Sequence, residues 1–83
     1  MIIKNEDVQE IVVEIPEGHK HIRTTIRLKS GQEFVFQEAT ISNLLRAFIT
    51  IKTHPQKTSI RLVSKRLDEL KPGYAPWQLL EED

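Results

Sequence analysis

The sequence contains no cysteine, so it has no disulfide, no thiolate metal site and no cysteine nucleophile. Small secreted domains usually carry disulfides, and their absence favours a reducing compartment, so we expect a cytoplasmic protein. No apolar run approaches the roughly 18 residues of a membrane span, and the first residues lack the pattern of a signal peptide. We therefore expect no membrane partner.

Glycine and aromatic residues are also scarce, with three glycines, three phenylalanines, one tyrosine and one tryptophan. No glycine-rich loop opens the predicted helix, and no aromatic pair stands on the outward face of a predicted strand. No serine lies in a nucleophile motif, and paired carboxylates occur only in segments that we expect to be solvated. The sequence therefore predicts no enzymatic activity and no cofactor.

Charge is balanced overall but unevenly distributed along the chain. Residues 1–17 carry one base and five acids, residues 18–66 carry ten bases and two acids, and residues 67–83 carry one base and five acids. A basic middle between two acidic ends is a pattern that points to an electrostatic role.

Residues 8–15 and 21–29 alternate apolar and polar side chains on either side of a Pro-Glu-Gly break. This alternation, with β-branched residues, predicts two antiparallel strands joined by a turn. Their register follows from the two faces, because a slip of one residue would turn every apolar side chain outward. The predicted pairs are Ile11 with Ile26, Glu10 with Arg27 and Glu14 with Arg23, with Val8, Val12 and Val35 on the outer face of the sheet.

A third strand is predicted over residues 32–38, after the turn Lys29-Ser30-Gly31. We expect a three-residue loop with Gly31 in the left-handed conformation, because this loop keeps both phenylalanines of the strand on the apolar face. The predicted pairs are Phe34 with Ile26, Phe36 with Thr24 and Glu33 with Arg27.

An amphipathic helix is predicted over residues 40–53, with Thr40 as its N-cap and Pro55 as its stop. Its apolar residues recur three and four positions apart, so they form one stripe. We expect this stripe to cover one face of the sheet. It consists of Ile41, Leu44, Leu45, Phe48 and Ile51.

Residues 58–70 fit a strand or a helix, and their β-branched opening favours a strand. Residues 71–83 follow as an extended tail. The sequence therefore predicts an α+β fold in a single small domain over residues 1–83. Its parts are a three-stranded antiparallel sheet, one amphipathic helix, a fourth strand and an extended C-terminal tail.

The segment 52–66 is a candidate for contact with anions, phosphate or nucleic acid, because it carries bases and no acid. The alternative interpretation is a solvated face, or a face paired with the acidic ends of the chain. The candidate residues are Lys52, His54, Lys57, Arg61, Lys65 and Arg66.

A second candidate is apolar, because one helix covers only one face of a small sheet. The tail either turns at Pro72-Gly73 and packs Trp77 over the outer face, or forms with that face a patch for a partner or a second copy of the chain. The candidate interface residues are Val12, Val35, Tyr74, Trp77, Leu79 and Leu80.

His19 and His21 lie two positions apart and point the same way on extended chain, but the sequence supplies no clear third and fourth metal ligand. We therefore expect no metal site. By elimination, the sequence favours a noncatalytic protein-interaction module that docks through the outer sheet face and the tail. Its partner is either another protein or a second copy of the chain, which would make it a homodimer. The alternative is a nucleic-acid or phosphate-binding protein that uses the basic segment.

Overall fold

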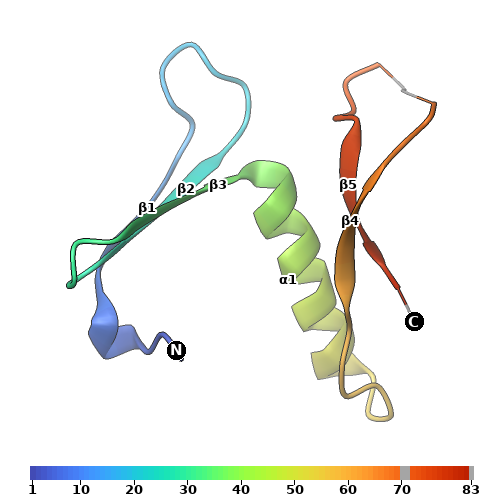
Figure 1. Ribbon diagram of the computed structural model, residues 1–83, viewed down its shortest axis with the longest axis horizontal. Coiled ribbons are helices and arrows are strands. Elements are labelled where there is room, and N and C mark those ends of the chain that lie inside the picture. The colour runs from blue at the N-terminus through green and yellow to red at the C-terminus, as the bar shows by residue number, and fades with distance from the viewer. Residues whose placement is uncertain (70–71, 83) are drawn as a thin grey trace. The chain divides into compact units, whose positions relative to one another are not determined.

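The computed structural model describes residues 1–69 and 72–82 and divides into two compact units, Met1–Ile41 and Ser42–Asp83 (Figure 1). The prediction of a single domain stays a prediction. Leu70, Lys71 and Asp83, at the ends of the predicted segments 58–70 and 71–83, lie outside the described residues.

The first unit is a three-stranded antiparallel sheet in the order β1-β2-β3. Each strand falls within the segment predicted for it, so the three-stranded sheet is confirmed. The strands are β1 (Val8–Glu14), β2 (Arg23–Leu28) and β3 (Glu33–Gln37), and a short 3₁₀ helix η1 (Asn5–Asp7) precedes them.

The predicted register is also confirmed, since Ile11 pairs with Ile26 and Ile26 pairs with Phe34. The loop between β2 and β3 has the expected three residues. The amide of Leu28 donates to the carbonyl of Gln32 over 2.8 Å, and Gly31 has a φ of 97°. Only glycine adopts that conformation without steric cost, and the loop keeps Phe34 on the apolar face.

The position of Val8 differs from the prediction. The register shifts between Val8 and Glu10, so Val8 pairs with Leu28 and lies on the face of Leu28 rather than on the outer face. A bulge of this kind inserts one extra residue and reverses the faces beyond it. No glycine or proline marks this bulge, so alternation alone did not predict it.

The helix α1 (Glu38–Thr53) confirms the predicted element but begins two residues earlier. Thr40 therefore lies inside the first turn, and its prediction as the N-cap is wrong. Glu38 is instead the first residue of the helix, where negative charge is favoured by the helix dipole. No residue separates the end of β3 at Gln37 from Glu38.

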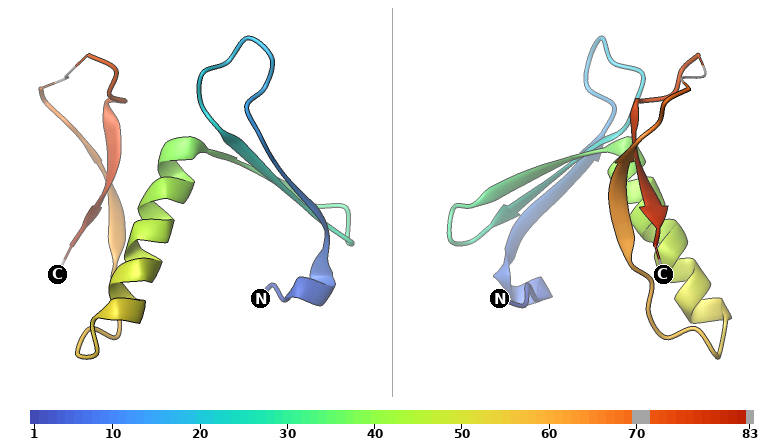
Figure 2. Two further views of the ribbon diagram at one scale, coloured as in Figure 1. Left: turned by 180° about the vertical axis from the view of Figure 1, so that it is seen from behind. Right: turned by 45° about the vertical axis from the view of Figure 1, so that its right-hand side comes forward.

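The second unit contains most of α1 and an antiparallel hairpin of β4 (Leu62–Arg66) and β5 (Trp77–Glu81). The fourth strand is confirmed, and the extended tail is itself a strand, because it returns through a turn at Gly73 (φ 85°) and pairs with β4. The hairpin runs alongside α1 in both views of Figure 2.

Very little of the chain is buried. Within residues 1–69 and 72–82, Leu28 and Thr24 are the two buried residues, and both belong to β2. A core of this size leaves large apolar side chains of each unit at its surface, and these side chains define the surfaces described next.

Candidate interaction surfaces

The inner face of the sheet is apolar and uncovered by its own unit. We define it by Ile11, Val13, Ile26, Phe34 and Phe36, which adjoin one another through the β1–β2 and β2–β3 pairs. Ile11 is 53% exposed and Val13 is 65% exposed, and Phe34 is also exposed. None of the five carries charge, and the polar residue between Val13 and Phe36, Thr24, is buried, so the exposed part of the face offers a partner mainly hydrophobic contact.

The helix stripe is a second apolar surface, formed in the second unit by Leu44, Leu45, Phe48 and Ile51. Leu45 is 54% exposed and Phe48 is 60% exposed, and the other two are exposed as well. The sequence predicts that this stripe covers one face of the sheet. In the structure, however, all four side chains of the stripe remain exposed.

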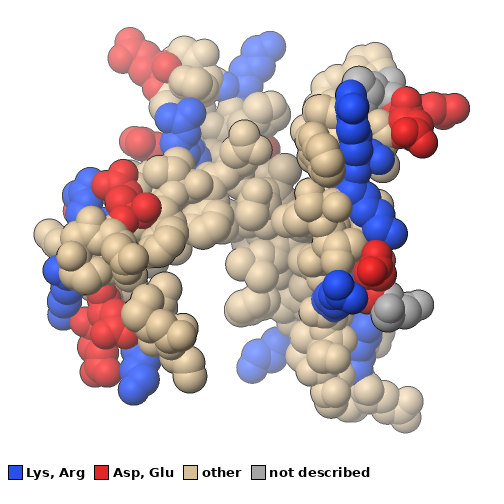
Figure 3. All heavy atoms as spheres, viewed as in Figure 1, with Lys and Arg blue, Asp and Glu red and all other residues tan. Residues whose placement is uncertain are grey.

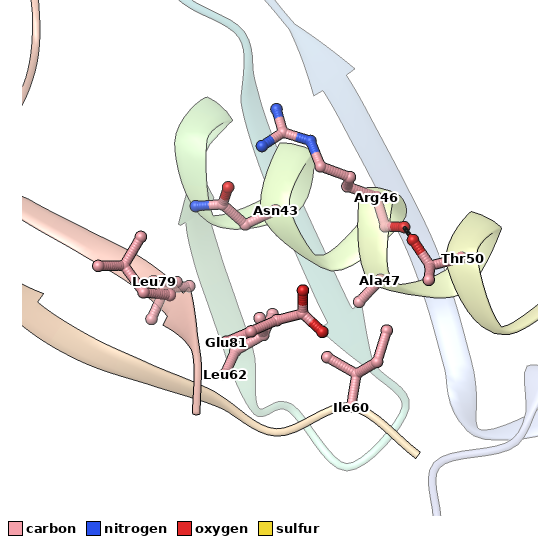
Figure 4. Close-up of a pocket in the computed structure, with 9 residues that line it drawn as sticks. Asn43, Arg46, Ala47, Thr50, Ile60, Leu62, Leu79 and Glu81 are labelled. Atoms are coloured by element: carbon pink, nitrogen blue, oxygen red, sulfur yellow. Dashed lines mark hydrogen bonds between the residues drawn. The ribbon is translucent and has the colours of Figure 1, made fainter. Parts of the chain in front are cut away.

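The opposite side of α1 faces the hairpin, as Figure 4 shows. Asn43, Ala47 and Thr50 recur three and four positions apart and lie across from strand residues such as Leu62 and Leu79. With 3.6 residues per turn, this side lies roughly opposite the helix stripe. The hairpin therefore covers the less apolar side of the helix.

A hollow of about 210 Å³ remains between α1 and the hairpin. Arg46 and Glu81 bring charge to its lining, and Asn43 adds an amide (Figure 4). Ligand pockets usually measure about 300–1,000 Å³, so this hollow is small for an organic ligand.

The predicted outer-face residues Val12 and Val35 are brought into one row by the register, with Thr25 between them. Both valines are exposed. The next row on this face is charged, because Arg27 is bridged by two carboxylates. The apolar strip on the outer face is therefore narrower than the inner face.

The predicted tail residues do not form one patch. Leu79 and Leu80 both line the hollow beside α1, and in the hairpin register Leu79 pairs with Ser64 and Leu80 with Val63. Trp77 lies opposite Arg66 and is 58% exposed, and Tyr74 is exposed in the turn before it. Half of Trp77 thus stays open within its own unit, which fits an interface better than a lid.

The basic segment is partly neutralised by the acidic end of the chain. Lys57 Nζ lies 2.9 Å from Glu81 Oε1, and Lys65 Nζ lies 3.0 Å from Glu82 Oε2. Arg61 Nη1 lies 3.7 Å from the same Glu82 carboxylate. Figure 3 shows both signs of charge close together on this unit.

The other candidate bases lie on different elements. Lys52 is in the last turn of α1, His54 follows the helix, and Arg66 ends β4 beside Trp77. The structure therefore brings three of the six predicted residues together with acids, and spreads the rest along the unit.

Two charged groups of the first unit have perturbed pKa values. Arg27 donates to Glu33 Oε2 from Nη2 over 3.1 Å and is also paired with Glu10, as predicted. The hydrogen bond that Arg27 donates to Glu33, together with the charges of both acids, raises the pKa of the Arg27 guanidinium above its ordinary value. This charged bridge ties the three strands together on the outer face.

Glu38 ties the start of α1 to the segment before β2. Its Oε1 accepts from the amide of Ile22 over 3.2 Å, and its Oε2 lies 3.0 Å from Nδ1 of His21. The backbone hydrogen bond, and then the His21 hydrogen bond, lower the pKa of the Glu38 carboxyl below its usual value. His21 therefore acts as a partner of the helix start.

No group of three or more histidine, aspartate or glutamate side chains in residues 1–69 and 72–82 is arranged to hold a metal ion. In the same residues, no helix has the length and apolar character needed to cross a bilayer.

Comparison of the chain with models of protein families, with curated proteins and with solved structures gives no match. The role of these surfaces is therefore argued from their own chemistry.

The inner face and the helix stripe were not predicted as candidate surfaces, because the sequence pattern pairs them with each other in one core. One signal in the sequence bears on that assumption. Between Phe36 and Thr40 there is no glycine, proline or asparagine, so no turn is marked between strand and helix. The structure has no loop there.

Proposed function

We propose that this chain is a noncatalytic protein-interaction module that docks a protein partner through its apolar surfaces. The observation that carries the proposal is the exposure of two uncharged apolar surfaces, the inner face and the helix stripe, while among the described residues only Leu28 and Thr24 are buried. Exposed patches of this kind on soluble proteins mark interaction sites.

The free energy of burying apolar side chains indicates that these surfaces need a partner to cover them. Full burial of a large apolar side chain stabilises a protein by about 1.5–3 kcal/mol. In the first unit, Leu28 is the one large apolar side chain among the described residues that is buried, with 3% of its surface exposed. A three-stranded sheet with so small a core gains most of its remaining stability from whatever covers Ile11, Val13 and Phe34.

The outer face and the tail extend the same proposal. Val12, Val35, Tyr74 and Trp77 are exposed, and exposed aromatic residues are enriched among the residues that dominate binding energy. The charged bridge around Arg27 limits the outer face to a narrow strip. The inner face and the helix stripe are therefore the larger docking surfaces.

The test uses an anilinonaphthalene sulfonate dye, whose fluorescence rises on exposed apolar surface. The folded chain at submicromolar concentration is expected to bind the dye, and Val13→Lys is expected to weaken the signal. The matched control is Gln9→Lys, an exposed residue of the same strand that belongs to neither the inner face nor the apolar strip of the outer face. A folded monomer that binds no dye would contradict the proposal, because its apolar surfaces would already be covered.

The alternative function, binding of nucleic acid or phosphate through residues 52–66, is weakened by the ion pairs of Lys57, Arg61 and Lys65. A carboxylate within 4 Å reduces the attraction of each base for phosphate.

An amide chemical-shift titration with short RNA and DNA tests this alternative. Shifts in residues 52–66 that survive near-physiological salt would favour it, because nonspecific phosphate contacts weaken steeply with salt. Glu82→Gln, which frees Arg61 and Lys65, should strengthen any such binding, while the control Asp68→Asn should not.

A further inference from the structure

We infer that the partner is a second copy of this chain, and that the helix stripe of each copy covers the inner face of the other. The inference rests on the proposed function and names its partner. The result is a closed dimer with two identical interfaces, which is the commonest symmetry of soluble oligomers.

The two surfaces match in chemistry and size. Neither the five residues of the inner face nor the four of the helix stripe include a charge, so their contact would bury no unpaired ion. Three strands lie about 4.8 Å apart, so the face is about as wide as one helix with its side chains, roughly 10–12 Å. One helix is enough to cover one sheet.

The junction between β3 and α1 argues for a second copy rather than the same chain. A helix that turns back over the sheet it follows usually has a connection of about 2–6 residues. Here Gln37 ends β3 and Glu38 begins α1. The Glu38 carboxylate also accepts a hydrogen bond from the amide of Ile22 and lies beside His21, so the first residue of the helix belongs to the unit of the sheet.

The hairpin does not cover the helix stripe, so the stripe is available to contact the inner face of a second copy. Because β4 and β5 lie against the side of α1 that carries Asn43, Ala47 and Thr50, a copy keeps its own hairpin while its stripe contacts a partner. The second unit therefore requires no rearrangement to take part in the dimer.

The experiment measures mass against concentration by sedimentation for two variants, Val13→Glu on the inner face and Phe48→Lys on the helix stripe. Both residues are more than half exposed in their own units, so the substitutions leave the units folded. We expect a wild-type dimer and, for each variant alone, a dissociation constant about 100-fold higher, tenfold for each of the two interfaces. The matched controls Gln9→Glu, an exposed residue of β1 outside both apolar faces, and Ser42→Lys should keep the wild-type mass.

Mixing the two variants tests the exchange directly. A mixed dimer has one interface with both substitutions and one that is wild type, so the mixture should form dimers at concentrations where each variant alone is monomeric. If either variant alone stays dimeric, or if the mixture gains nothing, reciprocal exchange is overturned.

A wild-type chain that is monomeric at all concentrations also overturns the inference, and dye binding then separates the two proposals. A monomer that binds the dye leaves the proposed function standing, with a different protein as the partner. A monomer that binds none overturns both.

Discussion

Arg27 lies in the middle strand with a carboxylate on each neighbouring strand, Glu10 on β1 and Glu33 on β3. Arg27→Gln should lower the midpoint of thermal unfolding by a few degrees at low salt, because it leaves both acids on one face without a base between them. The loss should shrink at 1 M salt, where the screening length is about 3 Å. Circular dichroism at both salt concentrations measures it.

Arg23→Gln is the matched control for this prediction. Arg23 lies on the same face of β2, opposite Glu14 in the register, and the described residues give it no ion pair. Equal losses of stability from the two substitutions would show that the bridge around Arg27 contributes nothing beyond a surface arginine.

Glu38 gives the protein a defined response to acid. Its folded pKa lies below the ordinary value of 4.5, so its contribution to stability is complete above that value and is lost as the pH falls through the folded pKa. Glu38→Gln should make the unfolding midpoint depend less steeply on pH between about pH 5 and about pH 3.

The control for this titration is Glu17→Gln, since the described residues give Glu17 no hydrogen bond and its side chain is exposed. A pH profile that changes equally in both variants would mean that the hydrogen bond from Ile22 does not hold the Glu38 carboxylate in its charged form.

At the scale of elements, the sheet was predictable because alternation, charge pairs and one glycine all favoured the same register. The register places Ile11, Ile26 and Phe34 on one face, as the alternation of apolar and polar residues predicts. The bulge that moves Val8 was not predictable, because a bulge leaves the alternation of later residues intact. The start of α1 was predicted two residues too late. Thr40 is a typical N-cap residue, but in the structure the helix begins at Glu38, whose side chain accepts a hydrogen bond from the amide of Ile22.

The hairpin of the second unit was predictable only in part. Residues 58–70 match both helix and strand spacing, and the strand assignment gains its physical support from a partner strand. That partner is the tail, whose own sequence has Pro72, Gly73 and Pro76 and gives little sign of a strand. Pairing between segments far apart in the chain is a tertiary effect that local patterns do not contain.

The sequence was enough to identify the apolar side chains of the candidate surfaces, but it did not predict that they would be exposed. The sequence identifies the helix stripe and the inner face, and it offers each as the natural cover for the other. Whether one chain or two supply that contact depends on the connection between β3 and α1, which periodicity does not address.

The junction itself gives a prediction for this element. Inserting Gly-Ser-Gly-Ser between Gln37 and Glu38 supplies a connection long enough for the helix to turn back, so the dimer that we infer should become a monomer. Sedimentation measures the change in mass. The same insertion after Gly18, in the turn between β1 and β2, should leave the mass unchanged. A dimer that survives the first insertion would show that the missing loop does not direct the helix to a second copy.

At the scale of the whole molecule, the chain has no net charge, and several of its acids lie close to bases. The acids near the C-terminus pair with bases of the preceding segment, through Glu81 with Lys57 and Glu82 with Lys65. With a net charge of zero, two copies meet without strong long-range repulsion. Association then depends on apolar contact and should respond weakly to salt.

Stability that comes from a second copy must depend on concentration. A tenfold rise in protein concentration favours a dimer by about 1.4 kcal/mol. At about 2–4 °C per kcal/mol for a folded unit of two chains, the wild-type midpoint should rise by about 3–6 °C. Val13→Glu should unfold at a lower temperature with little dependence on concentration, while Gln9→Glu, an exposed residue of the same strand, should keep the wild-type slope. A wild-type midpoint that stays constant over a hundredfold range of concentration would mean that each chain covers its apolar surfaces without a second copy.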